Sequence, residues 1–470
     1  MVTGEIATRP ARGGLLRRVG AGALLPITVF AMALALWYNI TGDGRTRFGD
    51  LDALLRRGAL TPDRFSLIGP LFSAPLYLLG AAFGYPEGGV VFFNLAVFII
   101  GLIALRALLR RHLAPATLRR FLLLLTAGSM FPAAVASYYG ETFTAIAVSV
   151  GLAAALLAER RWARLTGWLF VALGVANTPA TLLGLGLALL ARVWATRRLR
   201  YALPGAVALA LIMGESLLRR GSFFATGYMG DAGYKTVMPY SGLPGFSYPF
   251  LLGAASILFS FGKGLVFYTP GLFLPVKRRM LTRSAPGAGV WVWQLSCLLF
   301  VAGLIALYAS WWGWTGDWYW GPRFFLIAGV PASCALAVWA SRPSPRLWVN
   351  AGLLALLALS IWVGVDGAVF GTAGLQICQA NHNQYGALCA YTPDYSALWV
   401  PFENLARYGF SPTFARVEYF QSRAALLLII APVVWLYLAA PLLRAAAEQS
   451  RNLGATVAPI LRARVKSLRF

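Results

Sequence analysis

The sequence contains few charged side chains, and few of those are acidic. Of its 470 residues, 12% are charged and 59% are hydrophobic, whereas a soluble domain carries roughly 25% charged residues. This shortage excludes an ordinary soluble globular protein and indicates that lipid is the main solvent. Only 16 residues are Asp or Glu against 41 Lys or Arg, so the formal net charge is +25.

The sequence also has little material for histidine or metal chemistry. Its two histidines, His112 and His382, are predicted on opposite sides of the membrane, and its four cysteines form no CxxC motif. A His-based zinc site or a Ser-His-Asp triad is therefore not expected. Cys378 and Cys389 both lie in the last long polar segment, and on an oxidising face we expect them to form a disulfide; two free thiols are the alternative.

Apolar runs long enough to cross a bilayer recur along the whole chain. A hydrocarbon core of about 30 Å needs ~20 apolar residues as helix, because every backbone amide must be bonded within the segment. We therefore predict an all-α polytopic membrane protein, with about twelve transmembrane helices in one domain over residues 1–470. The predicted crossings are residues 20–40, 89–108, 121–137, 142–158, 164–177, 178–194, 201–218, 264–280, 290–309, 324–341, 347–369 and 424–443.

Basic residues gather at the ends of these runs and predict the orientation of the chain. Lys and Arg retain loops on the cytoplasmic side, so both termini, including the basic tail 444–470, are expected in the cytoplasm. The cytoplasmic segments then hold 28 of the 41 Lys and Arg but 3 of the 16 acids, and orientation accounts for the whole charge excess. No basic stripe with interleaved aromatics is left over, so nucleic acid is not an expected partner. The first run lacks a small-residue cleavage site and is expected to be a retained span.

Two apolar stretches do not fit a simple crossing. Residues 67–83 contain two prolines, and a crossing there would place the basic cluster at 110–120 outside, so we expect an interfacial or re-entrant helix. Residues 248–276 are too long for one untilted helix, and Lys263 lies in the middle, so we expect an outer-leaflet helix followed by a crossing. The outer loops, which are long enough to build a site, are then residues 41–88, 219–263, 310–323 and 370–423.

Acidic residues are the first candidates for catalysis, because 13 of the 16 lie outside or at the outer ends of spans. Asp50 and Asp52 follow the first span, where a carboxylate can act as a general base on a hydroxyl or hold a cation; the alternative is helix capping in a solvated loop. Glu141 lies beside Tyr139 in the short outer turn SYYGETF, and Asn177 is similarly placed in VANTPATLL. Both are either site residues or simple helix caps.

Two of the basic residues on the outer side, Lys263 and Arg323, are candidates for binding a phosphate. Lys263 stands between two glycines in SFGKGLVFYTP, where an ammonium can neutralise a phosphate; the alternative is a lysine that marks the membrane edge. Arg323 ends the loop YASWWGWTGDWYWGPR, whose tryptophans are typical of an interfacial aromatic belt. A guanidinium is a natural bidentate partner of phosphate.

In order and position these segments resemble those of the GT-C fold membrane glycosyltransferases that use polyprenyl-phosphate sugars. That group contains the protein mannosyltransferase-like and aminoarabinose transferase-like enzymes of bacteria. The acidic residues after the first span are followed in turn by GPLFSAPLYLLG, YYGETF, GKGLVFYTP and WYWGPRFFL. The match extends over nearly the whole chain and lies in the joint order of these elements rather than in any one of them.

The resemblance implies an inverting transfer of sugar from a polyprenyl-phosphate donor to a lipid, glycan or protein acceptor, on the outer face of a bacterial inner membrane. Asp50, with Asp52 as second candidate, would deprotonate the acceptor hydroxyl, and Lys263 and Arg323 would neutralise the departing phosphate. The acids are spaced D-L-D here and not as the adjacent D-E of some members, which leaves the choice of base open. Further substrate contacts are expected from Tyr139, Glu141, Asn177, Tyr268, Asp317 and Trp320.

The resemblance leaves the acceptor and the cofactor open. There is no large soluble C-terminal domain, so the loops 219–247 and 370–423 are expected to recognise the acceptor. No cofactor is implied, although a divalent cation is left open. Two other functions remain as alternatives: a transporter or flippase for a lipid-linked solute, which needs ionisable residues at mid-membrane, and an O-antigen-type ligase, for which His382 is the one outer histidine.

Overall fold

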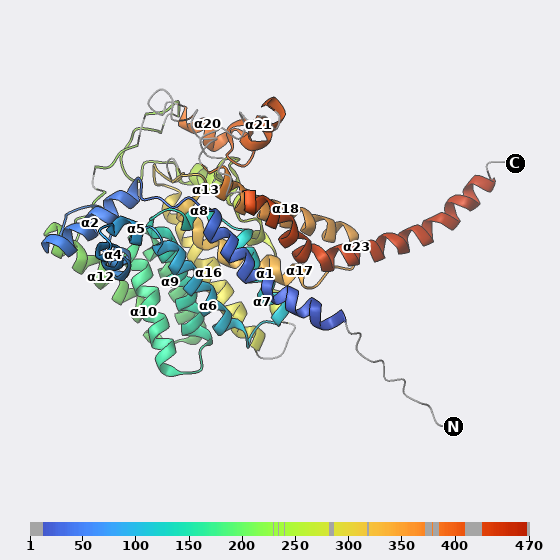
Figure 1. The fold of residues 1–470 in the computed structure, drawn as a ribbon, viewed down its shortest axis with the longest axis horizontal. Helices are drawn as coiled ribbons and strands as arrows, with labels where there is room; N and C mark the ends of the chain where they lie inside the picture. Colours follow the sequence, from blue (N-terminus) through green and yellow to red (C-terminus); the bar gives the residue numbers. More distant parts are fainter. Residues whose placement is uncertain are drawn as a thin grey trace.

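The computed structural model of the chain describes residues 13–467, apart from 229, 234, 239, 282–285, 317–318, 372–377, 379–384 and 409–424. Within this part every regular element is a helix, and extended pairing is limited to two isolated bridges. The predicted all-α class is confirmed. Figure 1 shows the helices packed into one body, from which the C-terminal helix projects.

Eight helical stretches of the described chain are long and apolar enough to cross a membrane, and each coincides with a predicted crossing, so the chain is a multi-pass membrane protein. They are Pro86–Leu109 (α5, Pro86–Val90, and α6, Phe93–Leu109), Gly140–Leu157 (α9), Pro179–Thr196 (η1, Pro179–Thr181, and α11, Leu182–Thr196), Leu199–Arg220 (η2, Leu199–Ala202, and α12, Leu203–Arg220), Gly289–Tyr308 (within α16, Pro286–Tyr308), Arg323–Ala340 (η4, Arg323–Ala328, and α17, Gly329–Ala340), Leu347–Val369 (α18) and Leu426–Asn452 (within α23, Ala425–Ser467).

Three other predicted crossings contain helices that are shorter or interrupted. The first is α1 (Gly13–Ala35), which carries Pro26. At 121–137 the chain forms α7 (Pro115–Ala127) and then the short α8 (Phe131–Val135), and at 164–177 it forms α10 (Arg161–Asn177).

The segment predicted as one crossing at 264–280 is not a continuous helix. It consists of α14 (Leu265–Tyr268), η3 (Pro270–Phe273) and α15 (Lys277–Leu281). Pro270 and Pro275 have no amide hydrogen to donate and their rings crowd the preceding turn, so a regular helix cannot pass through them.

Short helices cover one end of the bundle, where the interfacial elements are predicted. Residues 67–83 form α3 (Ile68–Phe72) and α4 (Ala74–Ala82), and nine residues of helix measure about 14 Å, too short to cross a bilayer. The apolar stretch before Lys263 forms α13 (Phe250–Phe259). The remaining elements at this end are α2 (Asp43–Arg57), α20 (Gly386–Tyr391), η7 (Pro393–Tyr395) and α21 (Val400–Tyr408).

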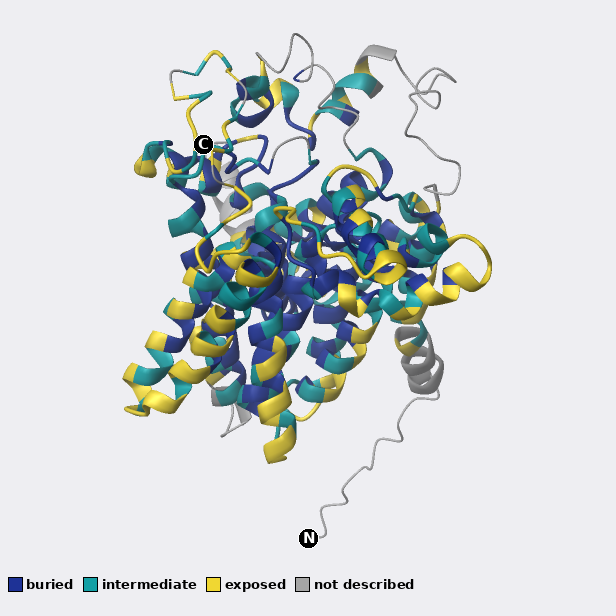
Figure 2. Cartoon of the chain, turned by 90° about the vertical axis from the view of Figure 1, so that its left-hand side faces the viewer, coloured by how far each residue is buried: buried dark blue, intermediate teal, exposed yellow. Residues whose placement is uncertain are grey.

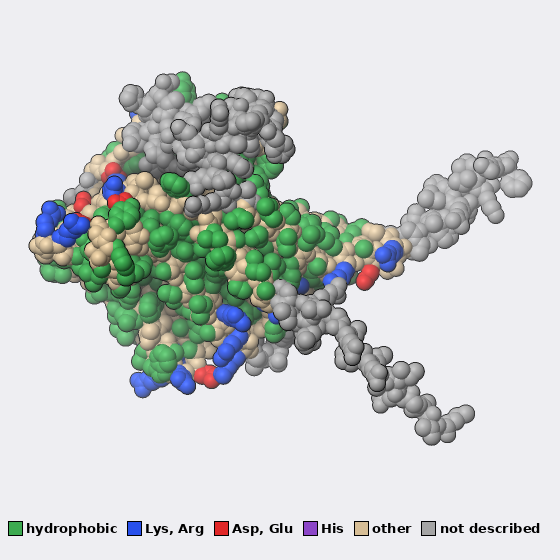
Figure 3. All heavy atoms as spheres, viewed as in Figure 1, with side chains coloured by type: hydrophobic (Ala, Val, Ile, Leu, Met, Phe, Trp, Pro, Cys, Tyr) green, Lys and Arg blue, Asp and Glu red, His purple; other side chains and the backbone are tan. Residues whose placement is uncertain are grey.

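Helix α9 forms the centre of the bundle, in contact with α6, α10 and α16. A Cβ atom added to Gly151 would lie 2.7 Å from the carbonyl oxygen of Gly167, so α9 and α10 touch backbone to backbone. Figure 2 shows the buried residues in this centre and the exposed ones around it. Figure 3 shows that the side of the bundle in view is largely hydrophobic, as a surface in lipid must be.

The two ends of the bundle differ in charge. Helix α9 has 18 residues, about 27 Å of helix, with Glu141 in its first turn and the Glu159–Arg111 ion pair (2.6 Å) just beyond its end. The span Arg323–Ala340 likewise begins at Arg323 and ends just before Arg342. Lys and Arg side chains gather at the lower edge in Figure 3, where the α9–α10 connection lies in Figure 1. These are called below the Glu141 end and the Arg342 end.

Candidate functional site

Arg323 holds two carboxylates from distant parts of the chain at the Glu141 end. Its Nη1 donates to Oδ2 of Asp43 at 2.7 Å, and its Nε lies 3.8 Å from Oε1 of Glu141. The Arg323 side chain is 12% exposed, and those of Asp43 and Glu141 are 23% and 16% exposed. Three charges therefore meet in a sheltered but accessible place, where charge-assisted hydrogen bonds are stronger than at an open surface.

Each member of this cluster lies at the start of a helix. Asp43 is the first residue of α2, and Gly42 before it has a φ of 51°, which a residue with a side chain rarely adopts. Glu141 lies in the first turn of α9, and Arg323 begins η4 directly after Pro322. The positive N-terminal ends of α2 and α9 favour the two carboxylates there.

Tyr139 and Tyr319 enclose the cluster with aromatic rings. The Arg323 guanidinium lies 5.1 Å from the centre of the Tyr139 ring, which in turn meets the ring of Tyr319 edge-on at 5.7 Å. Burial raises the pKa of Tyr139 despite the opposing effect of Arg323. The Tyr319 hydroxyl is buried and has no hydrogen-bond partner within the described part of the chain.

Lys263 joins the cluster through the loop that leads to Arg323. Its Nζ donates to the carbonyl oxygen of Tyr319, and the carbonyl oxygen of Gly321 lies 3.4 Å away. The residue is 3% exposed. The structure thus places Lys263, Glu141 and Arg323 at the same end of the bundle.

Asp50 belongs to a second cluster, which is buried. Its Oδ2 accepts from Nη2 of Arg219 at 2.9 Å, and its Oδ1 accepts from Thr61. Arg219 also pairs with Glu215 at 2.8 Å, and the side chains of Arg219 and Asp50 are each 1% exposed. Burial, together with a hydrogen bond to Asp63, raises the pKa of Asp50 to about 6. This cluster fastens α2 to the end of α12.

Neither predicted base touches Arg323. Asp50 follows Asp43 by seven residues, which is about 10 Å along helix α2. Asp52 accepts from the Tyr77 hydroxyl at 2.6 Å and pairs with Arg56 at 2.9 Å. The acid that the structure places on Arg323 is Asp43, which precedes both in the same loop.

Asn177 is saturated by contacts within the protein. Its Oδ1 accepts from the Gly69 amide at 2.9 Å, and its Nδ2 donates to the Gly140 carbonyl and to Oγ1 of Thr144, both at 3.0 Å. With 1% of its surface exposed, it ties α3, α9 and α10 together just beneath Glu141.

Tyr268 and Trp320 are also buried, behind the Lys263 loop. The Tyr268 hydroxyl donates to the Gly262 carbonyl at 2.9 Å, and Nε1 of Trp320 donates to Oδ2 of Asp366 at 2.5 Å. Both residues are 2% exposed or less, so they support the loop that carries Lys263. Asp317 lies outside the described residues.

A cavity of about 130 Å³ opens beside Lys263. Cys378 and Cys389, whose Cα atoms are 6.1 Å apart, form a disulfide in its wall. We call it the aromatic cavity, because it is lined by Lys263 and the disulfide together with Tyr240, Tyr248, Trp312, Trp314 and Tyr391. Aromatic faces and hydroxyls of this kind suit the apolar faces and hydroxyl groups of a sugar.

A shallow depression of about 10 Å³ adjoins Glu141 on the side of the bundle. Glu141 and a few threonines form its polar part. The rest is apolar and comes from α9, α16 and η4, with Phe300, Leu304, Tyr308, Phe324, Leu326 and Ile327 in its lining. The charged cluster therefore borders an apolar surface.

The sequence reading did not select Asp43 or Arg219. The signal for Asp43 was its place directly after Gly42 at the start of an amphipathic helix. The signal for Arg219 was a basic residue at the outer end of a span, like Arg323. Neither signal says which acid faces which base, since Asp43 and Arg323 lie 280 residues apart.

The described residues contain no group of three or more His, Cys, Asp or Glu side chains that could hold a metal ion. The carboxylates of Asp43 and Glu141 instead share the guanidinium of Arg323.

Comparisons with known proteins find a likeness in structure. No protein-family model and no curated protein matches the chain. Two solved structures of ArnT from Cupriavidus metallidurans are similar to it. The apo form has 16% identity and a TM-score of 0.45 and covers 95% of this chain and 80% of that one. The form bound to undecaprenyl phosphate has 17% identity and a TM-score of 0.46, covering 96% and 80%.

Proposed function

We propose that the chain is an inverting glycosyltransferase that moves a sugar from a polyprenyl-phosphate donor to a lipid, glycan or protein acceptor at the Glu141 end. One observation carries the proposal: Arg323 pairs with Asp43 and Glu141 beside Lys263, at a membrane boundary and next to an apolar depression. Such a site offers a base, two cations for a phosphate and a surface for a lipid tail.

The proposed reaction is a single displacement. The acceptor oxygen attacks the anomeric carbon, and the bond from that carbon to the phosphate oxygen breaks on the opposite side. The electron pair leaves with the polyprenyl phosphate, while the acceptor proton passes to Asp43. Arg323 and Lys263 stabilise the negative charge that grows on the departing phosphate, and little proton donation is needed there.

Asp43 and the donor phosphate would compete for the same guanidinium. In the structure Oδ2 of Asp43 lies 2.7 Å from Nη1 of Arg323. A phosphate binds a guanidinium in bidentate fashion, so a donor would displace Asp43 from Arg323. The released carboxylate then stands beside the anomeric carbon, ready to accept the proton. Donor binding would thus prepare the base.

Asp43 is the base that this geometry favours over Asp50 and Asp52. Asp50 is buried against Arg219, and Asp52 is engaged by Tyr77 and Arg56. A base must reach the proton that it removes, and a carboxylate that is 1% exposed cannot reach an acceptor hydroxyl. The assignment to Asp50 or Asp52 stays a prediction, which paired substitutions test below.

The two hollows next to the cluster are proposed to hold the ends of the donor. The polyprenyl chain would lie along the apolar depression beside Glu141, and the sugar would enter the aromatic cavity beside Lys263. A donor lipid of this kind belongs to the same class as the undecaprenyl phosphate bound to ArnT. The loops 219–263 and 370–423 would then recognise the acceptor. The Glu141 end faces the periplasm in this proposal, because the basic loops lie at the other end.

The alternative functions have less to rest on. A transporter needs an ionisable side chain at mid-membrane, and the carboxylate of Asp366 lies three residues from the end of α18, bonded to Trp320. The ligase reading depends on His382, which lies outside the described residues.

The test separates donor binding from transfer in purified protein. Arg323→Ala and Lys263→Ala should each weaken binding of undecaprenyl phosphate about tenfold or more, because each removes a charged phosphate contact. Asp43→Asn should abolish sugar transfer from a lipid extract of the host without weakening the binding of undecaprenyl phosphate. Asp50→Asn and Asp52→Asn are the matched controls, expected to retain transfer. Loss of transfer in Asp50→Asn with full transfer in Asp43→Asn would overturn the choice of base. Unchanged lipid binding in both cation variants would overturn the function.

A further inference from the structure

The Cys378–Cys389 disulfide lies against the chain segment that carries Lys263. Its two cysteines are 1% and 4% exposed, and both line the aromatic cavity together with Lys263. Cys389 belongs to α20, so the disulfide fastens this short helix to Cys378. A helix of six residues has little stability of its own, and a covalent bridge restrains it.

Residues 386–396, called here the clamp, bond to the two residues that precede the lysine. The amide of Gly262 donates to the carbonyl oxygen of Ala390 at 3.0 Å. The hydroxyl of Ser396 donates to the carbonyl oxygen of Phe261 at 2.9 Å. The clamp thus holds this stretch through its backbone groups, whatever side chains the stretch carries.

Backbone also packs against backbone at this contact. A Cβ atom added to Gly262 would lie 1.7 Å from the carbonyl oxygen of Cys389, so the fit requires a glycine. The hydroxyl of Tyr268 holds the carbonyl oxygen of Gly262 from within the bundle, and the clamp holds its amide. The next residue is Lys263, whose Nζ donates to the carbonyl oxygen of Tyr319. The place of the ammonium therefore depends on how Gly262 is held.

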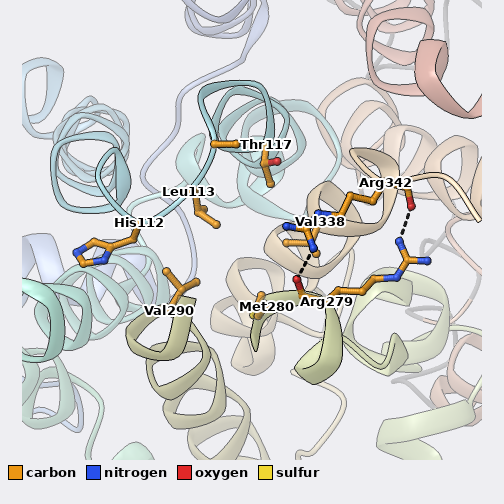
Figure 4. A pocket seen from close by; sticks show the side chains of 9 residues that line it. His112, Leu113, Thr117, Arg279, Met280, Val290, Val338 and Arg342 are labelled. Carbon is orange, nitrogen blue, oxygen red and sulfur yellow. Dashed lines mark hydrogen bonds between the residues drawn. The ribbon is translucent and has the colours of Figure 1, made fainter. Parts of the chain in front are cut away.

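The other end of the broken segment, at α15, is fastened separately. Arg342 donates to the carbonyl oxygen of Arg279 at 2.7 Å, and Arg279 donates to that of Arg342, as Figure 4 shows. The chain between this point and Lys263 consists of three short helices in place of one long one. A broken chain transmits position poorly, so contacts at the Glu141 end decide where Lys263 lies.

We propose that the Cys378–Cys389 disulfide positions Lys263 for the donor phosphate, so that the chain binds polyprenyl phosphate fully only in its oxidised form. The inference rests on the phosphate role of Lys263 in the proposed function. The two cysteines are positioning residues, because they act through the clamp and Gly262 on a charge that would contact the phosphate.

Donor binding would then depend on the redox state of the compartment that the Glu141 end faces. A dithiol reductant would break the sulfur–sulfur bond and give each sulfur one electron and one proton, while the reductant itself closes to a disulfide. An oxidising compartment such as the periplasm keeps the bridge closed. A bridge that merely stabilised the outer loops would act on stability and not on Lys263 in particular, and this difference can be measured.

The experiment is a double-mutant cycle on the purified full chain, with undecaprenyl phosphate as the ligand. Cys378→Ala/Cys389→Ala should weaken binding several-fold, but no more than Lys263→Ala does, because it misplaces the charge that Lys263→Ala removes. In the Lys263→Ala background, loss of the disulfide should change the affinity by less than about twofold. Losses that multiply in the triple variant would overturn the proposal, and so would wild-type affinity without the disulfide. Wild-type affinity in Lys263→Ala itself would instead count against the proposed function.

The matched control is Cys297→Ala/Cys334→Ala, which removes the two free, buried cysteines. It should bind undecaprenyl phosphate like wild type, even where its melting temperature falls as far as that of the disulfide variant. An equal loss of affinity in both cysteine pairs would trace the effect to stability and overturn the role of the disulfide.

Two milder variants take over should the disulfide variant not fold. Ser396→Ala removes the bond from the clamp to Phe261 and should weaken binding about two- to threefold, but leave the affinity of Lys263→Ala unchanged. Thr392→Ala removes a hydroxyl that bonds within the clamp, to the carbonyl oxygen of Leu388 at 2.7 Å, and should bind like wild type. Equal affinities in these two variants would overturn the proposal.

Discussion

Replacing Asp43 with asparagine should tighten the binding of polyprenyl phosphate while abolishing transfer. The structure places the Asp43 carboxylate on Arg323 at 2.7 Å, where the proposed donor phosphate must also bind. Asparagine has nearly the same shape but no charge, so it competes less for the guanidinium. Lipid binding should thus become stronger while sugar transfer is lost, whereas a misfolded protein would lose both.

The size of the effect follows from the exposure of the ion pair. A hydrogen bond between charged groups contributes about 1.5–3 kcal/mol, and a pair open to solvent about 0–1 kcal/mol. With the Arg323 and Asp43 side chains 12% and 23% exposed, a value of about 1–1.5 kcal/mol lies between these cases. Undecaprenyl phosphate should therefore bind Asp43→Asn roughly 5- to 10-fold more tightly than wild type.

The assay is a titration of purified protein in detergent with undecaprenyl phosphate, followed by calorimetry or intrinsic fluorescence. Glu141→Gln is the matched control: Glu141 lies 3.8 Å from Nε of Arg323, beyond hydrogen-bond distance, so its loss should tighten binding by a smaller factor. Weaker binding in Asp43→Asn would refute the competition between Asp43 and the phosphate. Retained transfer in that variant would refute its role as base.

Three further predictions follow from the structure. Gly151→Ala should lower the free energy of unfolding by about 1–3 kcal/mol, because the added methyl group overpacks the contact with α10, and the apparent melting temperature should fall accordingly. Gly186→Ala, which has open space around the new methyl group, is its control, and an equal loss in both would contradict the close contact of α9 with α10. The pKa of Asp50 is raised to about 6 in the folded protein, so the free energy of unfolding of the wild type should fall as pH rises from about 4 to 7, by at most roughly 3 kcal/mol. Asp50→Asn should flatten this fall. If the variant and the wild type gave parallel pH curves, Asp50 would not be the group that titrates in this range. Chelation with EDTA should leave transfer unchanged, since a guanidinium already bridges the carboxylates at Arg323, and loss restored by a divalent cation would assign them to a metal.

The sequence predicted which segments contribute to much of the candidate site. Glu141, Lys263 and Arg323 stand out because charge is rare at the outer ends of apolar runs, and the structure gathers them. The sequence could not show which of Asp43, Asp50 and Asp52 contacts Arg323. These three acids lie within ten residues on helix α2, and the direction in which each side chain points depends on how that helix packs. The structure sets Asp43 on Arg323 and buries Asp50 against Arg219.

The sequence by itself determined the class of protein and the place of most spans. A bilayer core accepts only backbone that is bonded within its own helix, so the length and spacing of apolar runs suffice to predict crossings. Tertiary structure alone decided the pairing of Asp43 with Arg323 and the meeting of Arg279 with Arg342. These contacts join residues 63 to 280 positions apart. They depend on how the finished helices pack, and no local pattern in the sequence records that packing.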